Sequence, residues 1–200
     1  MKDIDALDLD KLLHDNLDEK DLNSMLNLIS QVSWWVNPDV YHSVPVVYPK
    51  TRRKKGKELR GEIINGIRLW LNEPAKDAFW FALGKKPKEI MNFYICHIYE
   101  NSVGDPEHFT NLANITAFPK SLQSLSEWKP VSDLLKYQSY KLYGYTGPEN
   151  KIPTTPKYYP ESWQYVSEPS HSEKERIKEK LRQQCTKRPT CNSKDNHLRH

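Results

Sequence analysis

The run IMNFYICHIY at residues 90–99 does most to constrain the fold of this chain. Aromatic and β-branched residues dominate the run, and such residues favour β-strands. Helices are predicted on both sides of it. Residues 73–83 have a proline in the first turn and Gly84 just past the end, and residues 131–143 form a second helical segment with Ser132 as its N-cap. The sequence therefore predicts an α+β fold with this strand in the core.

Composition excludes several classes of protein. No apolar run approaches the roughly 20 residues that a membrane-spanning helix needs, and the acidic N-terminus lacks the apolar stretch of a signal peptide. Three cysteines among 200 residues are too few for a disulfide framework. The 7 glycines form neither of the glycine-rich motifs that cradle nucleotide phosphates. We therefore expect a cytoplasmic protein without a membrane partner.

The net charge of +4 conceals a strong segregation of charge along the chain. Residues 1–48 carry three basic and nine acidic residues, whereas residues 49–90 carry twelve basic and five acidic residues. Residues 91–150 are close to neutral, and residues 151–200 are basic again. Segregation of this kind indicates a charged partner.

The basic block is densest at PKTRRKKG, residues 49–56. Its cations are hardly diluted by acidic residues, which is typical of a segment that contacts the phosphate groups of nucleic acid. A solvated charged loop is the alternative. The residues expected to make phosphate contacts are Arg52, Arg53, Lys54 and Lys55.

Three segments are predicted along the chain. Residues 1–44 form an N-terminal arm, in which leucines recur every three or four residues and predict one or two amphipathic helices. Their apolar face either packs on the core or forms a dimer contact. Residues 45–147 form the central domain. Residues 148–200 begin as a linker rich in proline, continue with a charged helix over about 172–184, and end in a tail that we expect to be partly disordered.

The side chains that carry chemistry are expected within residues 94–125. His97 lies at the end of the predicted strand, in the pattern Cys-His-Ile. Asn114 follows after a loop, in the pattern Ala-Asn-Ile. An apolar step then leads into a predicted helix that carries Lys120 and Gln123.

This order of residues resembles the HNH, or ββα-metal, nuclease family. YPKTRR, the CHIY run, the asparagine, a Pro-Lys step and a Leu-Tyr-Gly helix end follow one another over residues 45–147, as in a bacterial subfamily of predicted HNH endonucleases. The resemblance implies a small ββα-metal core with flanking helices. It implies that His97 is the general base and that Asn114 braces the loop that orients it, with Asn111 as a second candidate for the brace.

These residue types suit the hydrolysis of a phosphodiester bond. Histidine has the unperturbed pKa of a base near neutral pH, and an asparagine amide can donate to a carbonyl while it accepts from an N–H. The resemblance also implies a bound Mg²⁺ or Mn²⁺. Its candidate ligands are Gln123, Asp105 and Glu100, and Lys120 is expected at the phosphate.

Two positions depart from the family pattern. Cys96 stands where the family usually places a metal-binding Asp or His, and a thiolate is a poor partner for Mg²⁺. We interpret Cys96 as a small buried residue. Gln123 stands where the pattern has His or Asn.

Two functions are therefore expected. The first is a metal-dependent endonuclease that acts on DNA, in restriction or phage defence. The alternative is a non-catalytic nucleic-acid-binding protein on a decayed HNH scaffold. One HNH site cuts one strand per event, so cleavage of both strands would favour a homodimer through the N-terminal helix. An interaction protein that works through this helix alone is a third interpretation.

Overall fold

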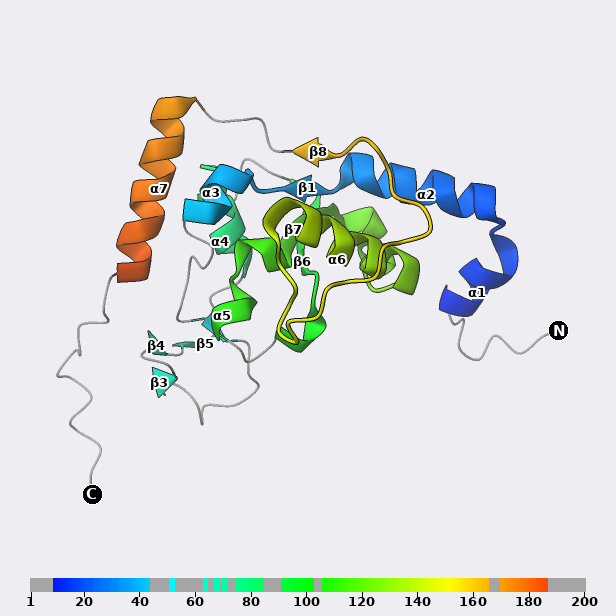
Figure 1. The fold of residues 1–200 in the computed structure, drawn as a ribbon, viewed down its shortest axis with the longest axis horizontal. Helices are drawn as coiled ribbons and strands as arrows, with labels where there is room; N and C mark the ends of the chain where they lie inside the picture. The colour runs from blue at the N-terminus through cyan, green and yellow to red at the C-terminus, as the bar shows by residue number, and fades with distance from the viewer. Residues whose placement is uncertain are drawn as a thin grey trace, which may run out of the picture.

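The computed structural model describes residues 9–43, 51–52, 63–64, 67–68, 70–71, 75–84, 91–102, 106–165 and 170–186. Helices and strands are mixed along the chain, so the predicted α+β class is confirmed (Figure 1). The α-helices of this part of the chain are α1 (Leu9–Asn16), α2 (Glu19–Val32), α3 (Pro38–Ser43), α4 (Ala75–Ala82), α5 (Pro106–Phe109), α6 (Lys129–Tyr143) and α7 (His171–Thr186). None of them is long and apolar enough to cross a membrane.

A four-stranded sheet forms the centre, in the order β6–β7–β1–β8. The long pair is β6 (Phe93–His97) with β7 (Ile115–Pro119), which run antiparallel. The short strands β1 (Trp34–Trp35) and β8 (Gln164–Tyr165) pair in parallel with each other, and β1 runs antiparallel to β7. Two small ladders lie apart from this sheet: β2 (Thr51–Arg52) with β5 (Trp70–Leu71), and β3 (Ile63–Ile64) with β4 (Ile67–Arg68).

The predicted strand is therefore confirmed as β6, and the predicted helices around it are confirmed as α4 and α6. Gly84 adopts φ +64°, the left-handed conformation that ends a helix most easily with glycine. The N-cap prediction was wrong, because α6 starts after Trp128 and Ser132 lies within its first turn. Pro130 explains the earlier start, since its ring holds the backbone angle that the first turn requires.

One or two amphipathic helices were predicted in the N-terminal arm; its described part forms two, α1 and α2, and the short helix α3 follows them. Asp18 begins α2, because its side chain accepts a hydrogen bond of 2.8 Å from the Asp21 amide. Strand β1 was not predicted from the sequence. Trp35 is fully buried in this strand, and the Trp34 carbonyl accepts a hydrogen bond of 2.9 Å from the Thr116 hydroxyl. The arm therefore continues directly into the central sheet.

The segment after α6 corrects the prediction of a linker. The ring of Trp163 packs edge-on against the fully buried ring of Trp35, with the centroids 5.9 Å apart. The Tyr159 hydroxyl donates a hydrogen bond to the buried side chain of Gln138. The proline- and tyrosine-rich segment therefore packs on the core. The central sheet includes β1 from before the predicted domain boundary at 44/45 and β8 from after the predicted domain boundary at 147/148.

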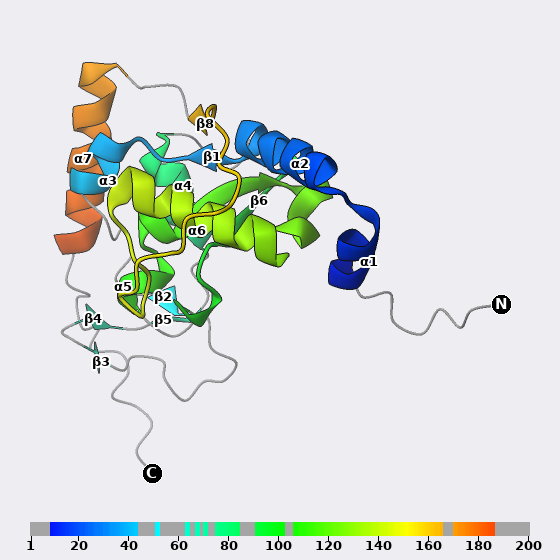
Figure 2. The same ribbon diagram turned by 45° about the vertical axis from the view of Figure 1, so that its right-hand side comes forward.

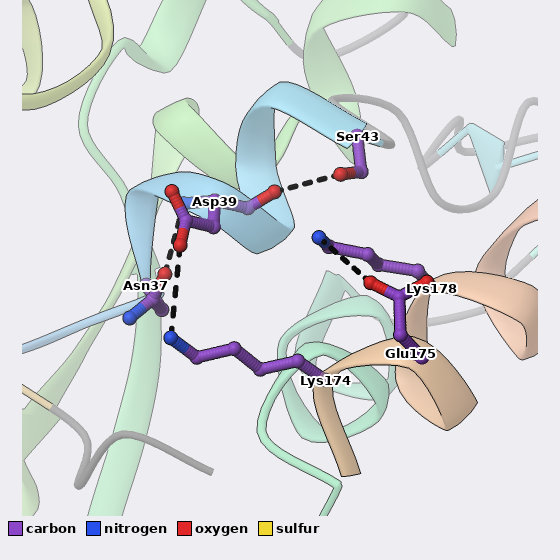
Figure 3. A network of polar contacts seen from close by, with 6 residues as sticks. All are labelled: Asn37, Asp39, Ser43, Lys174, Glu175 and Lys178. Carbon is purple, nitrogen blue, oxygen red and sulfur yellow. Dashed lines mark hydrogen bonds and ion pairs between the residues drawn. The ribbon is translucent and has the colours of Figure 1, made fainter. Parts of the chain in front are cut away.

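Helix α7 confirms the predicted charged helix near the C-terminus and packs on α3 and α4 (Figure 1). Among the described side chains of α7, Ile177 is buried against Gly84. Lys174 Nζ lies 3.6 Å from Asp39 Oδ2 in α3, and the Asp39 amide donates to Asn37 Oδ1 at 2.8 Å (Figure 3). The predicted tail after residue 190 lies outside the described residues.

We predict that Trp163→Ala lowers the free energy of unfolding by about 2 kcal/mol, less than for a fully buried tryptophan because Trp163 is half-buried. Urea denaturation should show a lower midpoint with an unchanged slope. The matched control is Ile152→Ala in the same segment, where the side chain is 62% exposed and the change should stay within about 0.5 kcal/mol. Equal effects of the two variants would restore the interpretation of this segment as a linker.

Candidate active site

His97 is the last residue of β6 and pairs with Ile115 at the start of β7. Its half-buried ring places Nε2 at 2.8 Å from the carbonyl oxygen of Phe109. A carbonyl oxygen only accepts hydrogen bonds, so Nε2 carries the hydrogen. The ring also packs against the Phe109 ring, with the centroids 4.6 Å apart. Phe109 therefore sets both the orientation and the tautomer of His97.

Asn114 ties the two ends of the loop between β6 and β7 together. Its side chain is fully buried at the end of the 3₁₀ helix η3 (Leu112–Asn114). Oδ1 accepts from the Tyr99 amide at 2.9 Å, and Nδ2 donates to the His108 carbonyl at 3.0 Å. The Asn114 carbonyl also accepts from the Ile98 amide at 2.9 Å. Both hydrogen bonds expected of an amide brace are present.

Asn111 has a more local role than Asn114. Its side chain accepts from the Ala113 amide at 2.9 Å and thereby begins η3. This bond spans two residues, whereas the amide of Asn114 joins the Tyr99 amide, before α5, to the His108 carbonyl within α5. Of the two candidates, the geometry places Asn114 at the brace.

The structure separates Lys120 and Gln123 from His97. Lys120 begins the 3₁₀ helix η4 (Lys120–Ser126), directly after Pro119, which pairs with Phe93 at the opposite end of the hairpin. Four residues of strand span about 13 Å. The Lys120 amide donates to the Asn92 carbonyl at this far end, and both predicted side chains are exposed. The predicted helix after Pro119 is a 3₁₀ helix here.

Glu100, a predicted metal ligand, lies in the 3₁₀ helix η2 (Glu100–Ser102) and is exposed. It lines a hollow of about 660 Å³ together with Asp133 and Lys136 of α6. Asp105 lies outside the described residues. Within the described part of the chain, no three His, Cys, Asp or Glu side chains come together as a metal site. The described residues alone therefore supply no such ligand set for Mg²⁺ or Mn²⁺.

Cys96 is buried in the core, as predicted, and its thiol faces the Thr116 carbonyl at 3.7 Å. Burial raises the pKa of this thiol to about 12. The side chain is therefore a neutral thiol near neutral pH, and metal ligation requires the thiolate.

The predicted basic block is described only at Arg52. This residue belongs to β2, which lies beside α5 (Figure 2). The last residue of α5 is Phe109, whose carbonyl contacts His97. Arg52 therefore belongs to a strand beside the helix that positions His97. Arg53, Lys54 and Lys55 lie outside the described residues.

Sequence reasoning missed the two carbonyl acceptors, on His108 and Phe109. No sequence signal could identify them, because every residue has a backbone carbonyl. It also missed Tyr99, whose amide meets Asn114 and whose buried hydroxyl makes no hydrogen bond. Burial, with a smaller contribution from Glu149, raises the pKa of Tyr99 to about 12. Gly147 packs so closely on this ring that a Cβ would lie 2.5 Å from it.

Comparisons with protein-family models, with curated proteins and with solved structures found no match. The likeness to HNH nucleases therefore rests on the sequence motifs.

We predict that Asn114→Ala lowers the free energy of unfolding by about 2–4 kcal/mol, because it leaves the Tyr99 amide and the His108 carbonyl without their partner. Asn111→Ala is the matched control and should cost about 1 kcal/mol, as expected for a lost cap. Chemical denaturation of both variants measures the difference. Equal losses would contradict the assignment of the brace to Asn114.

Proposed function

We propose that this chain is an HNH-type endonuclease that hydrolyses phosphodiester bonds in DNA. The observation that carries the proposal is the combination of His97 at the end of β6 with a buried asparagine that braces the following loop. The order of strand, braced loop, strand and helix is the order that the HNH resemblance implies.

The proposed base is His97. With its hydrogen on Nε2, a neutral imidazole carries its lone pair on Nδ1, and this nitrogen would take the proton from the attacking water. The ring becomes a cation in that step. The Nε2–H bond to the Phe109 carbonyl then becomes charge-assisted and stronger, which stabilises the protonated ring.

Arg52 supports DNA as the substrate. Its strand lies beside α5, and the segment of residues 49–90 carries twelve basic and five acidic residues. A cation on this strand would neutralise a phosphate close to the proposed base. Mg²⁺ or Mn²⁺ remains a prediction from the family resemblance, and we assign no step of the reaction to it.

The resemblance also carries the wider proposals. A role in restriction or phage defence and a location in the cytoplasm remain predictions. A homodimer through the N-terminal helices also remains a prediction, and it would let two sites cut the two strands of a duplex.

We predict that His97→Ala abolishes DNA nicking, with a loss of at least about a hundredfold because the base is removed. Purified protein is incubated with supercoiled plasmid and Mg²⁺ or Mn²⁺, with EDTA as the blank. The matched control is His42→Ala, which removes an exposed histidine from α3 and should nick like the parent. Nicking by His97→Ala at the rate of the parent would show that His97 is not the base.

The alternative function is a nucleic-acid-binding protein without catalysis. The buried thiol of Cys96 and the lack of a ligand group within the described residues favour it. Under this alternative, the parent protein binds DNA but nicks no plasmid with either metal ion. A parent that neither binds nor nicks DNA would contradict both functions.

Both functions predict binding that weakens with salt. Arg52→Ala/Arg53→Ala should lower the slope of log K against log salt by about 2, since each phosphate contact contributes about 0.9. Lys141→Ala/Lys157→Ala removes two exposed cations elsewhere and serves as the control for net charge. Fluorescence anisotropy with a labelled duplex measures the slope. An equal slope for the two double variants would contradict the assignment of the basic block.

A further inference from the structure

A buried tyrosine connects the end of α6 to the loop of the candidate site. Tyr145 follows Gly144, whose φ of +68° ends α6 in the left-handed conformation. The Tyr145 hydroxyl lies 2.6 Å from Nδ1 of His108, a residue 37 positions earlier in the chain. The hydroxyl donates to Nδ1 when the neutral ring carries its hydrogen on Nε2, and accepts when Nδ1 carries it. The two residues are therefore paired in either tautomer of His108.

His108 lies next to the backbone acceptors of both Asn114 and His97. Its own carbonyl accepts from the side chain of Asn114, and the next carbonyl, that of Phe109, accepts from His97. The position of the His108 side chain is therefore coupled to the acceptor that orients the proposed base. Tyr145 thus contacts the side chain of the same α5 residue whose carbonyl contacts the brace.

Tyr145 also contacts the other partner of the brace. Its ring packs edge-on against Tyr99, with the centroids 5.6 Å apart and the planes at 85°. The Tyr99 amide donates to Asn114 Oδ1. One side chain at the end of α6 therefore touches the residues on both sides of the Asn114 amide, through its ring on one side and its hydroxyl on the other.

We propose that Tyr145 and His108 form a positioning pair that holds α5 so that the Phe109 carbonyl meets Nε2 of His97. The proposal rests on the proposed function insofar as His97 is the base. Neither residue of the pair touches the reacting atoms. Loss of the pair lets the end of α5 move, and His97 then loses its fixed tautomer and its alignment with the water.

Tyr145→Phe tests the pair because it removes one oxygen and keeps the packed ring. The matched control is Tyr143→Phe, two residues earlier. Tyr143 is equally buried, and its hydroxyl donates a hydrogen bond of the same length, 2.6 Å, to the Val36 carbonyl, away from α5. The two variants therefore lose the same kind of bond from the same end of α6, and only one of these bonds reaches His108.

Two measurements test the effect of these variants on His97. Ring ¹H–¹⁵N spectra, with His97 assigned through His97→Gln, report its tautomer without any assay of activity. Plasmid nicking gives kcat and KM. We expect Tyr145→Phe to mix the tautomers of His97 and to lower kcat by up to about a hundredfold at unchanged KM, as misalignment of a base does. Tyr143→Phe should change neither. Identical spectra and kcat for the two variants would overturn the positioning pair.

Changes at His108 provide the rescue test. An asparagine places its terminal O and N as many bonds from the backbone as Nδ1, so His108→Asn should retain the bond to Tyr145 and most of kcat. His108→Leu should behave like Tyr145→Phe. If His108→Leu matches the parent in both measurements, the pair has no positioning role.

The two proposals can fail separately. If the parent protein nicks no DNA, the proposed endonuclease activity is contradicted. The ring spectra of His97 then still test the positioning pair, because they need no activity. A shifted tautomer in Tyr145→Phe alone supports the pair, whereas unchanged spectra refute it. Circular dichroism of each variant shows that the comparison is made between folded proteins.

Discussion

The buried amide of Asn114 is the interaction on which the candidate site depends. It meets one backbone group before α5, the Tyr99 amide, and one within α5, the His108 carbonyl. A buried backbone group without a partner costs about 1–3 kcal/mol. Any other conformation of the loop would leave the Tyr99 amide and the His108 carbonyl without their hydrogen bonds to Asn114. The asparagine thereby holds a loop of irregular structure in one conformation. The orientation of His97 depends on that conformation, because the carbonyl that orients its ring belongs to Phe109, the residue directly after His108.

The hairpin that carries His97 is held by segments from far along the chain. β1 comes from the N-terminal arm, and β8 comes from the segment beyond α6. Trp35 of β1 is fully buried and contacts both Trp163 and Tyr143. These large rings bury apolar area that a two-stranded hairpin could not cover by itself. The arm and the proline-rich segment are therefore parts of one core, although their compositions differ from that of the central domain.

Local signals account for the features that could be predicted. β-prone residues predicted β6, and a glycine with positive φ ended α4 at Gly84. His97 was predicted at the strand end because the β-prone run and the motif coincide there. The brace by Asn114 was expected from the resemblance to HNH nucleases, and an asparagine amide has the donor and the acceptor that such a brace needs. The remainder could not be predicted. β1 and β8 are two residues long and exist only through their pairing. Lys120 is close to the motif in sequence but follows the end of β7 that lies far from His97.

The sequence by itself determined the α+β class, the main helices, the strand that ends in His97 and the segregation of charge, because propensity, capping and charge are properties of neighbouring residues. Only the tertiary structure decided which atoms meet at the site. The acceptors of His97 and Asn114 are backbone carbonyls, which every residue has, so residue identity cannot reveal them. Whether a histidine is held in one tautomer depends on contacts between segments that are distant in sequence, and these form only when the whole sheet assembles.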